Sequence, residues 1–166
     1  IYSCNTTDED ELNEAMEELK IQSKLNKAYT IDEVRDKMIN GAAAIGVIYS
    51  GEYLYCQEEN EDLEYVIPKE GTNIWYDGWV ITKGSENVEN AHKWIDFLCS
   101  QEAAYDNFEY IYYGTPNIAA QELIDEDIIN NPGVFPDEET IEKCEVYNYL
   151  GEEAEDMYYE LWKKVK

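Results

Sequence analysis

The chain has 166 residues, of which 44% are apolar and 13% aromatic, so it can bury the core of one ordinary domain and is not disordered throughout. Its 38 Asp and Glu against 12 Lys and Arg give a net charge of −26. Such a charge repels nucleic acid phosphates and anionic lipid head groups, which argues against both as partners. No stretch of the sequence reaches the apolar length of a membrane span.

Two capping-box patterns stand in the first quarter of the chain. Thr6 precedes Glu9 by three residues, and Thr30 precedes Glu33 by the same interval. Apolar residues recur at helical spacing after each pair. The patterns predict a helix over 8–20, a short strand over 27–30 and a second helix that Gly41 ends.

Short apolar runs mark the middle of the chain. The run 43–49 is nearly continuous and of strand length, which is typical of a strand buried on both faces of a parallel sheet. Further strands are predicted over 63–67, which Pro68 ends, and over 74–82, with a short helix over 52–57.

In the second half of the chain, apolar residues recur mainly at helical spacing. Helices are predicted after a cap at Ser85 or Asn87, over 101–111, from an Asn117 cap to Leu123, and over 137–144 and 152–164. Helices that alternate with short apolar strands predict an α/β sheet covered on both sides.

The strand that begins at Ile74 contains the most informative residues. Alternate side chains of a strand share a face, so Trp75 and Asp77 are expected to lie together. An aromatic face beside a carboxylate suits an organic ammonium ion. Alternatively, Trp75 fills a core and Asp77 caps a turn before Gly78, and the spacing alone leaves both interpretations open.

Five segments together resemble a known family. They are YSCNTTDEDELNEAMEEL near the start, IGVIYSGEYLY at 45–55, GTNIWYDGWVITKGSENVENAHKWIDFL at 71–98, YYGTPN at 112–117 and FPDEETIEKCEVYNYLG at 135–151. They are similar, in the same order, to the C-terminal part of the bacterial polyamine-binding receptors of ABC importers. These receptors belong to the wider family of extracellular solute-binding proteins.

The resemblance implies a fold. It is α/β, periplasmic-binding-protein-like (type II), with two lobes that close on the ligand by a hinge motion. The chain is then an incomplete two-lobed receptor that begins partway through the second lobe. We expect 1–74 to be the second-lobe α/β part, 75–111 a crossover strand and helices of the first lobe, and 112–166 the return to the second lobe.

The resemblance also implies ligand contacts. Trp75 and Asp77 match the family's Trp-x-Asp, in which the carboxylate binds an ammonium and the indole stacks on the alkyl chain. Tyr49, at the end of the run 43–49, stands where these receptors often have Trp. A strand end that faces a cleft is the usual place for a ligand in an α/β fold. Further carboxylates of the family come from a segment upstream of Ile1.

Three further residues have weaker matches. Tyr113 precedes Thr-Pro-Asn, as in the family, or it is simply a packed aromatic residue at a helix end. Tyr147 stands where the family often uses Gln to bond an amine, and a phenol lacks the amide geometry. Thr30 lies near a hydroxyl contact of the family, although a role as helix cap explains it better.

The resemblance predicts a non-catalytic receptor. It would capture spermidine or putrescine at the extracellular face of the membrane or in the periplasm, and deliver it to ABC permease subunits. It would meet the membrane only through the permease or an upstream anchor. No cofactor and no metal is expected, because the four cysteines form no C-x-x-C pair and the acidic run at 7–11 lacks the spacing of an EF-hand.

Two alternative functions remain open at this point. A ferric-ion receptor of the same fold would use adjacent tyrosines, which Tyr112 and Tyr113 supply. A carboxylate-dependent hydrolase is the contrasting class, but no nucleophile elbow, P-loop or H-E-x-x-H occurs, and His92 lies on a charged stretch. In the isolated chain, the apolar stripe of the helix after Asn87 is expected to promote self-association.

Overall fold

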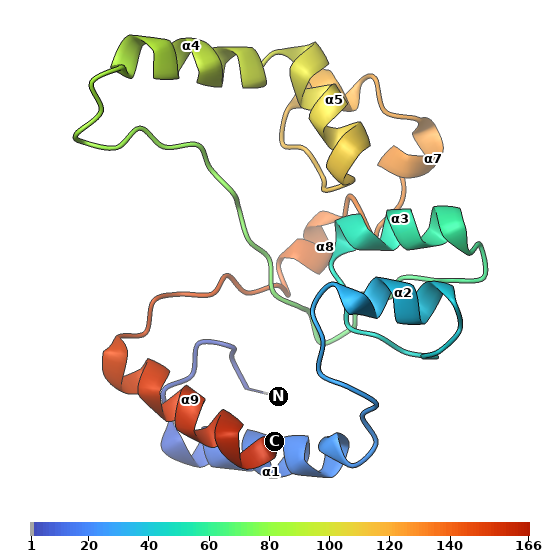
Figure 1. The fold of residues 1–166 in the computed structure, drawn as a ribbon, viewed down its shortest axis with the longest axis vertical. Coiled ribbons are helices and arrows are strands. Elements are labelled where there is room, and N and C mark those ends of the chain that lie inside the picture. The colour runs from blue at the N-terminus through green and yellow to red at the C-terminus, as the bar shows by residue number, and fades with distance from the viewer. Residues whose placement is uncertain (1) are drawn as a thin grey trace. The chain divides into compact units, whose positions relative to one another are not determined.

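The computed structural model describes residues 2–166, which divide into two compact units (Figure 1). Unit 1 comprises the residues up to Ile31 together with Pro68–Trp75 and Thr140–Lys166. Unit 2 comprises Asp32–Ile67 and Tyr76–Glu139. Each unit is therefore assembled from segments that are distant in the sequence.

The described residues form helices joined by extended or irregular segments. Unit 1 contains α1 (Glu9–Ser23) and α9 (Glu152–Val165). Unit 2 contains α2 (Glu33–Ile39), α3 (Ser50–Glu59), α4 (Val88–Leu98), α5 (Gln101–Ile111), α6 (Ile118–Gln121) and α7 (Glu126–Ile129), and α8 (Glu138–Ile141) lies where the chain passes from unit 2 to unit 1. No helix among residues 2–166 is long and apolar enough to cross a membrane.

Unit 1 is centred on the pairing of α1 with α9 (Figure 1). Leu12 and Met16 of α1 are buried together with Leu161 and Val165 of α9. Asp8 caps α1 by accepting hydrogen bonds from the backbone N–H groups of the first turn, where acidic side chains also complement the helix dipole. The first and last parts of the chain therefore pack on each other through one apolar stripe from each helix.

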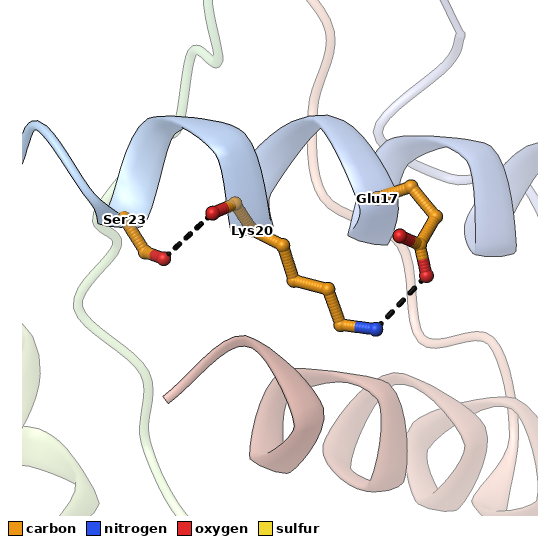
Figure 2. Close-up of polar contacts among 3 residues, drawn as sticks. All are labelled: Glu17, Lys20 and Ser23. Carbon is orange, nitrogen blue, oxygen red and sulfur yellow. Dashed lines mark hydrogen bonds and ion pairs between the residues drawn. The ribbon is translucent and has the colours of Figure 1, made fainter.

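The outer surface of α1 is polar. Figure 2 shows the Lys20 ammonium 2.9 Å from a Glu17 carboxylate oxygen, and the Ser23 hydroxyl donating to the Lys20 carbonyl at 2.9 Å. An exposed pair at this spacing contributes about 0.2–0.5 kcal/mol. The stability of α1 therefore comes mainly from its buried face.

Unit 2 has its own core. Tyr53 and Leu54 of α3 pack with Phe108 of α5 and with Ile124 and Val134. The ring of Tyr65 stacks on Tyr53 at a centroid distance of 5.1 Å. This core fixes α3 against the end of α5, from which the segment with Tyr113 continues.

The predicted helices are confirmed, with shifted ends. Helix α5 has the predicted bounds, and Asn117 caps α6 through a hydrogen bond from the Ala120 N–H. Two predicted capping residues were wrong. Asp8 caps α1 in place of Thr6, and Asp32, not Thr30, stands at the N-terminal cap position of α2, where it makes no side-chain cap bond.

The predicted strands do not form. Over 27–30, 43–49, 63–67 and 74–82 the described residues make no strand, and the structure contains one isolated parallel bridge, between Asn73 and Glu145. A strand is stabilised by a continuous series of backbone hydrogen bonds to a neighbour, and among residues 2–166 these runs have no such series: Ile74, at the start of the last run, bonds to Glu145 beside the isolated bridge. Consistently, Ile45 is 90% exposed and Val47 is 95% exposed. The expected α/β sheet is thus not confirmed over residues 2–166.

Candidate functional site

The parallel bridge joins the two segments of unit 1 that contain the predicted ligand residues Trp75 and Tyr147. The Ile74 N–H donates to the Glu145 carbonyl at 2.9 Å, and the Glu145 N–H donates to the Thr72 carbonyl at 3.0 Å. The bridge is isolated. Trp75 lies two residues beyond Asn73 on one segment, and Tyr147 lies two residues beyond Glu145 on the other.

Both aromatic side chains are accessible. Trp75 is 38% exposed and Tyr147 is 64% exposed. An accessible indole and an accessible phenol each provide a π surface against which an alkylammonium can lie. The two segments that contain these residues are far apart in the sequence, and the bridge joins them.

The carboxylate of Glu145 is held just before this pair. It accepts hydrogen bonds from the Ser3 hydroxyl and, at 3.5 Å, from the Cys4 thiol. The Ser3 hydrogen bond is the main reason that the pKa of Glu145 is lowered from its usual range. Burial and the Glu145 hydrogen bond raise the pKa of the Cys4 thiol, so Cys4 stays protonated at neutral pH.

Tyr49 and Tyr113 come together in unit 2. Tyr49 precedes the first turn of α3, and the ring of Tyr113 packs so closely on Gly51 that a Cβ there would lie 2.5 Å from it. Burial raises the pKa of Tyr113 to about 12, with further contributions from Glu52 and Tyr49. Tyr113 is therefore a neutral phenol that can donate and accept hydrogen bonds.

An ion pair lies next to this tyrosine pair. Arg35 Nε is 3.6 Å from a Glu52 carboxylate oxygen, and the guanidinium lies 5.6 Å from the centroid of the Tyr55 ring. The charge of Arg35 lowers the pKa of Tyr113, against the larger effects of burial and Glu52. No sequence motif pointed to Arg35 or Glu52, because their pairing joins α2 to α3.

The structure does not bring the other two predicted site residues, Asp77 and Thr30, next to a further predicted site residue. Asp77 is exposed and belongs to unit 2, whereas Trp75 ends a segment of unit 1. The strand that was to place both on one face does not form, so a shared face stays a prediction. Thr30 is exposed in unit 1, near the end of its first segment. The ligand roles of all six residues likewise stay predictions.

The adjacent tyrosines diverge. The Tyr112 hydroxyl donates to Glu58 at 2.7 Å, whereas Tyr113 packs on Gly51. Positions 51 and 58 are separated by about 10 Å along α3, given a rise of about 1.5 Å per residue. Two tyrosines directed to opposite ends of one helix do not make a common iron site. Among residues 2–166, no group of three or more His, Cys, Asp or Glu is placed to hold a metal ion.

The chain was compared with known proteins. Residues 6–136 match the family described as bacterial extracellular solute-binding protein. The spermidine/putrescine-binding periplasmic protein of Salmonella typhimurium is 35% identical over 165 residues, 99% of this chain and 47% of that protein. The putrescine-binding periplasmic protein of Pseudomonas aeruginosa is 28% identical, with coverage of 99% and 47%. The chain thus spans about half the length of these relatives.

Solved structures of similar proteins superpose closely on this chain. A putative spermidine/putrescine ABC transporter protein from Listeria monocytogenes superposes with a TM-score of 0.88 at 40% identity, over 99% of this chain and 51% of that one. The substrate-binding protein of a spermidine/putrescine ABC transporter from Streptococcus pneumoniae gives 0.89 at 36% identity, with coverage of 99% and 51%. The periplasmic-binding-protein-like (type II) fold is therefore confirmed, although the sheet expected for it is not seen here. The chain belongs to the family of bacterial extracellular solute-binding proteins.

Proposed function

We propose that this chain is part of the substrate-binding component of an ABC importer that captures a polyamine, spermidine or putrescine, outside the membrane. Its partners are then the polyamine and the permease subunits of the importer. The proposal rests on one observation above all: Trp75 and Tyr147 lie on two segments that a backbone bridge joins, each two residues beyond the bridge, and both are accessible.

The chemistry of this pair suits a polyamine. Aromatic faces attract an ammonium ion through their quadrupole and cover the methylene groups between two charges. A carboxylate such as Asp77 adds an ion pair and accepts N–H bonds. Capture needs no bond to be made or broken, so this arrangement serves a receptor without any catalytic group.

The names of the relatives support the same ligand class. The proteins from Salmonella, Pseudomonas, Listeria and Streptococcus described above are named for spermidine or putrescine. Two of them are named as periplasmic, which favours a location outside the inner membrane for the protein proposed here. Adjacent tyrosines that diverge provide no comparable support for a ferric ion.

Titration calorimetry of the intact protein tests the proposal. Putrescine and spermidine are titrated in parallel with 1,4-butanediol, which keeps the four-carbon chain but has no charge. We expect saturable binding of the amines and none of the diol. Trp75→Ala should weaken amine binding about tenfold or more through lost stacking and cation–π contact, whereas Trp94→Ala, an exposed Trp of α4, should not. Equal effects of the two substitutions would contradict the proposal.

A further inference from the structure

The side chain of Asn5 bonds the backbone on both sides of Tyr147. Its Nδ2 donates to the Val146 carbonyl at 2.9 Å, and its Oδ1 accepts from the Asn148 N–H at 2.7 Å. A residue in a parallel sheet makes the same two bonds to the residues that flank its neighbour. The amide of Asn5 therefore replaces a strand partner for 146–148.

The opposite edge of the same segment is occupied by the bridge. The N–H and carbonyl of Glu145 bond to the backbone of 72–74, while the bonded groups of Val146 and Asn148 face Asn5. Successive residues of an extended segment direct their backbone groups to alternate sides. The segment with Tyr147 is thus fixed along both edges, by one backbone segment and one side chain.

Asn5 is itself held in place. Its N–H donates to the Ser3 hydroxyl at 3.0 Å, and its Nδ2 also lies 3.4 Å from a Glu145 carboxylate oxygen. The next residue, Thr6, accepts a hydrogen bond of 2.8 Å from the Tyr158 hydroxyl of α9. Asn5 is therefore held by contacts to Ser3 and Glu145, and the backbone next to it is bonded to α9.

From these contacts we propose that Asn5 is a positioning residue, which fixes the backbone of 146–148 and so holds the Tyr147 ring in place for an alkylammonium ligand. The proposal rests on the proposed function. Only an amide supplies one donor and one acceptor at this spacing. Without it, the ligand itself must order the segment, and that ordering weakens its binding.

Asn5→Ala and Asn5→Asp in the intact protein test the role, with Asn13→Ala as the matched control. Asn13 also donates its Nδ2 to a backbone carbonyl, that of Glu9 at 2.7 Å, but on the exposed face of α1. Asn5→Asp keeps an acceptor for the Asn148 N–H but places a charge against the Val146 carbonyl. It provides a second variant should Asn5→Ala fail to fold.

Two readouts are needed. Amide hydrogen exchange should show that the Asn148 N–H loses protection in Asn5→Ala and keeps it in Asn13→Ala. Calorimetry should show putrescine binding weakened about tenfold in Asn5→Ala, the effect of one or two lost hydrogen bonds. In a Tyr147→Ala background the same substitution should change the affinity by less than twofold, because it acts through Tyr147.

The outcomes separate the two proposals. We call the two hydrogen bonds from the Asn5 amide to Val146 and Asn148 the clamp. If the Asn148 N–H keeps its full protection in Asn5→Ala, the clamp does not exist. Lost protection with unchanged affinity, or an equal loss of affinity in the Tyr147→Ala background, overturns the positioning role. Should the unsubstituted protein bind no polyamine, the proposed function fails and the ligand role of Asn5 with it, while exchange at Asn148 still reports whether the clamp exists.

Discussion

At the scale of single residues, charge and burial decide what each side chain of the candidate site can contribute. Trp75 and Tyr147 offer exposed π faces, and Tyr113 is kept protonated by burial. Asp77 is exposed, so its carboxylate is hydrated and has to lose water before it pairs with an ammonium. Its effect on affinity therefore depends on how completely the bound ligand excludes water.

Asp77→Asn in the intact protein is expected to weaken polyamine binding by about 2–4 kcal/mol, because it removes the charge that pairs with a desolvated ammonium. Calorimetry with putrescine measures the change. Asp96→Asn, which removes an exposed carboxylate from α4, is the control. An affinity within twofold of the unsubstituted protein, with the fold intact, would mean that Asp77 does not contact the ligand.

The raised pKa of Tyr113 predicts a loss of stability in alkali. In the unfolded chain this phenol ionises near its usual pKa of about 10, whereas in the folded protein its pKa is about 12. The folded state therefore holds more protons between pH 10 and pH 12, and the free energy of unfolding falls as pH rises through that window. Below pH 10 the contribution of Tyr113 is fully present.

Urea denaturation at several pH values from 9.5 to about 12 tests this assignment. Tyr113→Phe should show a shallower fall in the free energy of unfolding than the unsubstituted chain. Tyr110→Phe, which alters a tyrosine that is 88% exposed, should leave the slope unchanged. Identical slopes for all three proteins would show that Tyr113 is not buried as described.

At the scale of elements, close approaches decide how the site segments are held. Helix α3 begins beneath the ring of Tyr113, and that approach requires glycine at position 51. A Cβ there would also lie 2.7 Å from the Ile111 carbonyl oxygen. The end of α5 and the start of α3 therefore fit together only without a side chain between them.

Two effects of Gly51→Ala on stability oppose each other, and the contact with Tyr113 decides which is larger. Within a helix, alanine is favoured over glycine by up to about 1 kcal/mol. Overpacking against Tyr113 should outweigh that gain and destabilise the protein by about 1–3 kcal/mol. Thermal or urea unfolding measures the sign. Gly84→Ala, at a position with no neighbour within 4 Å, is the control, and stabilisation by Gly51→Ala would contradict the close contact.

At the scale of the whole molecule, the described residues expose much apolar surface. Helix α4 buries none of its residues, and Val88, Trp94 and Phe97 are exposed. The extended segments with Ile45, Val47 and Val80 are exposed as well. In the absence of strand partners these side chains remain in water, which favours association with other apolar surfaces.

The isolated 166-residue chain is therefore expected to self-associate and to bind spermidine more weakly than millimolar. Exposed ion pairs contribute only about 0–1 kcal/mol each, so a hydrated ammonium is poorly held. Light scattering coupled to size exclusion gives the mass, and calorimetry gives the affinity. A monomer with micromolar affinity for spermidine would contradict both expectations.

The sequence by itself determined the helices and the family. Helical spacing and local caps are properties of neighbouring residues, so α1, α5 and α9 were predicted within a few residues of their ends. The five matching segments identified the family because they depend only on the order of residues. The strands were wrong because a strand is stabilised by a partner that local spacing does not specify.

The tertiary structure alone decided which segments of the candidate site are joined. Trp75 and Tyr147 are 72 positions apart in the sequence, and a single backbone bridge, between Asn73 and Glu145, joins their segments. Asn5, which no motif marked, bonds the backbone on both sides of Tyr147. These hydrogen bonds join positions 141 and 143 residues apart in the sequence. Local spacing reflects only neighbouring residues, so no pattern around Asn5 could indicate them.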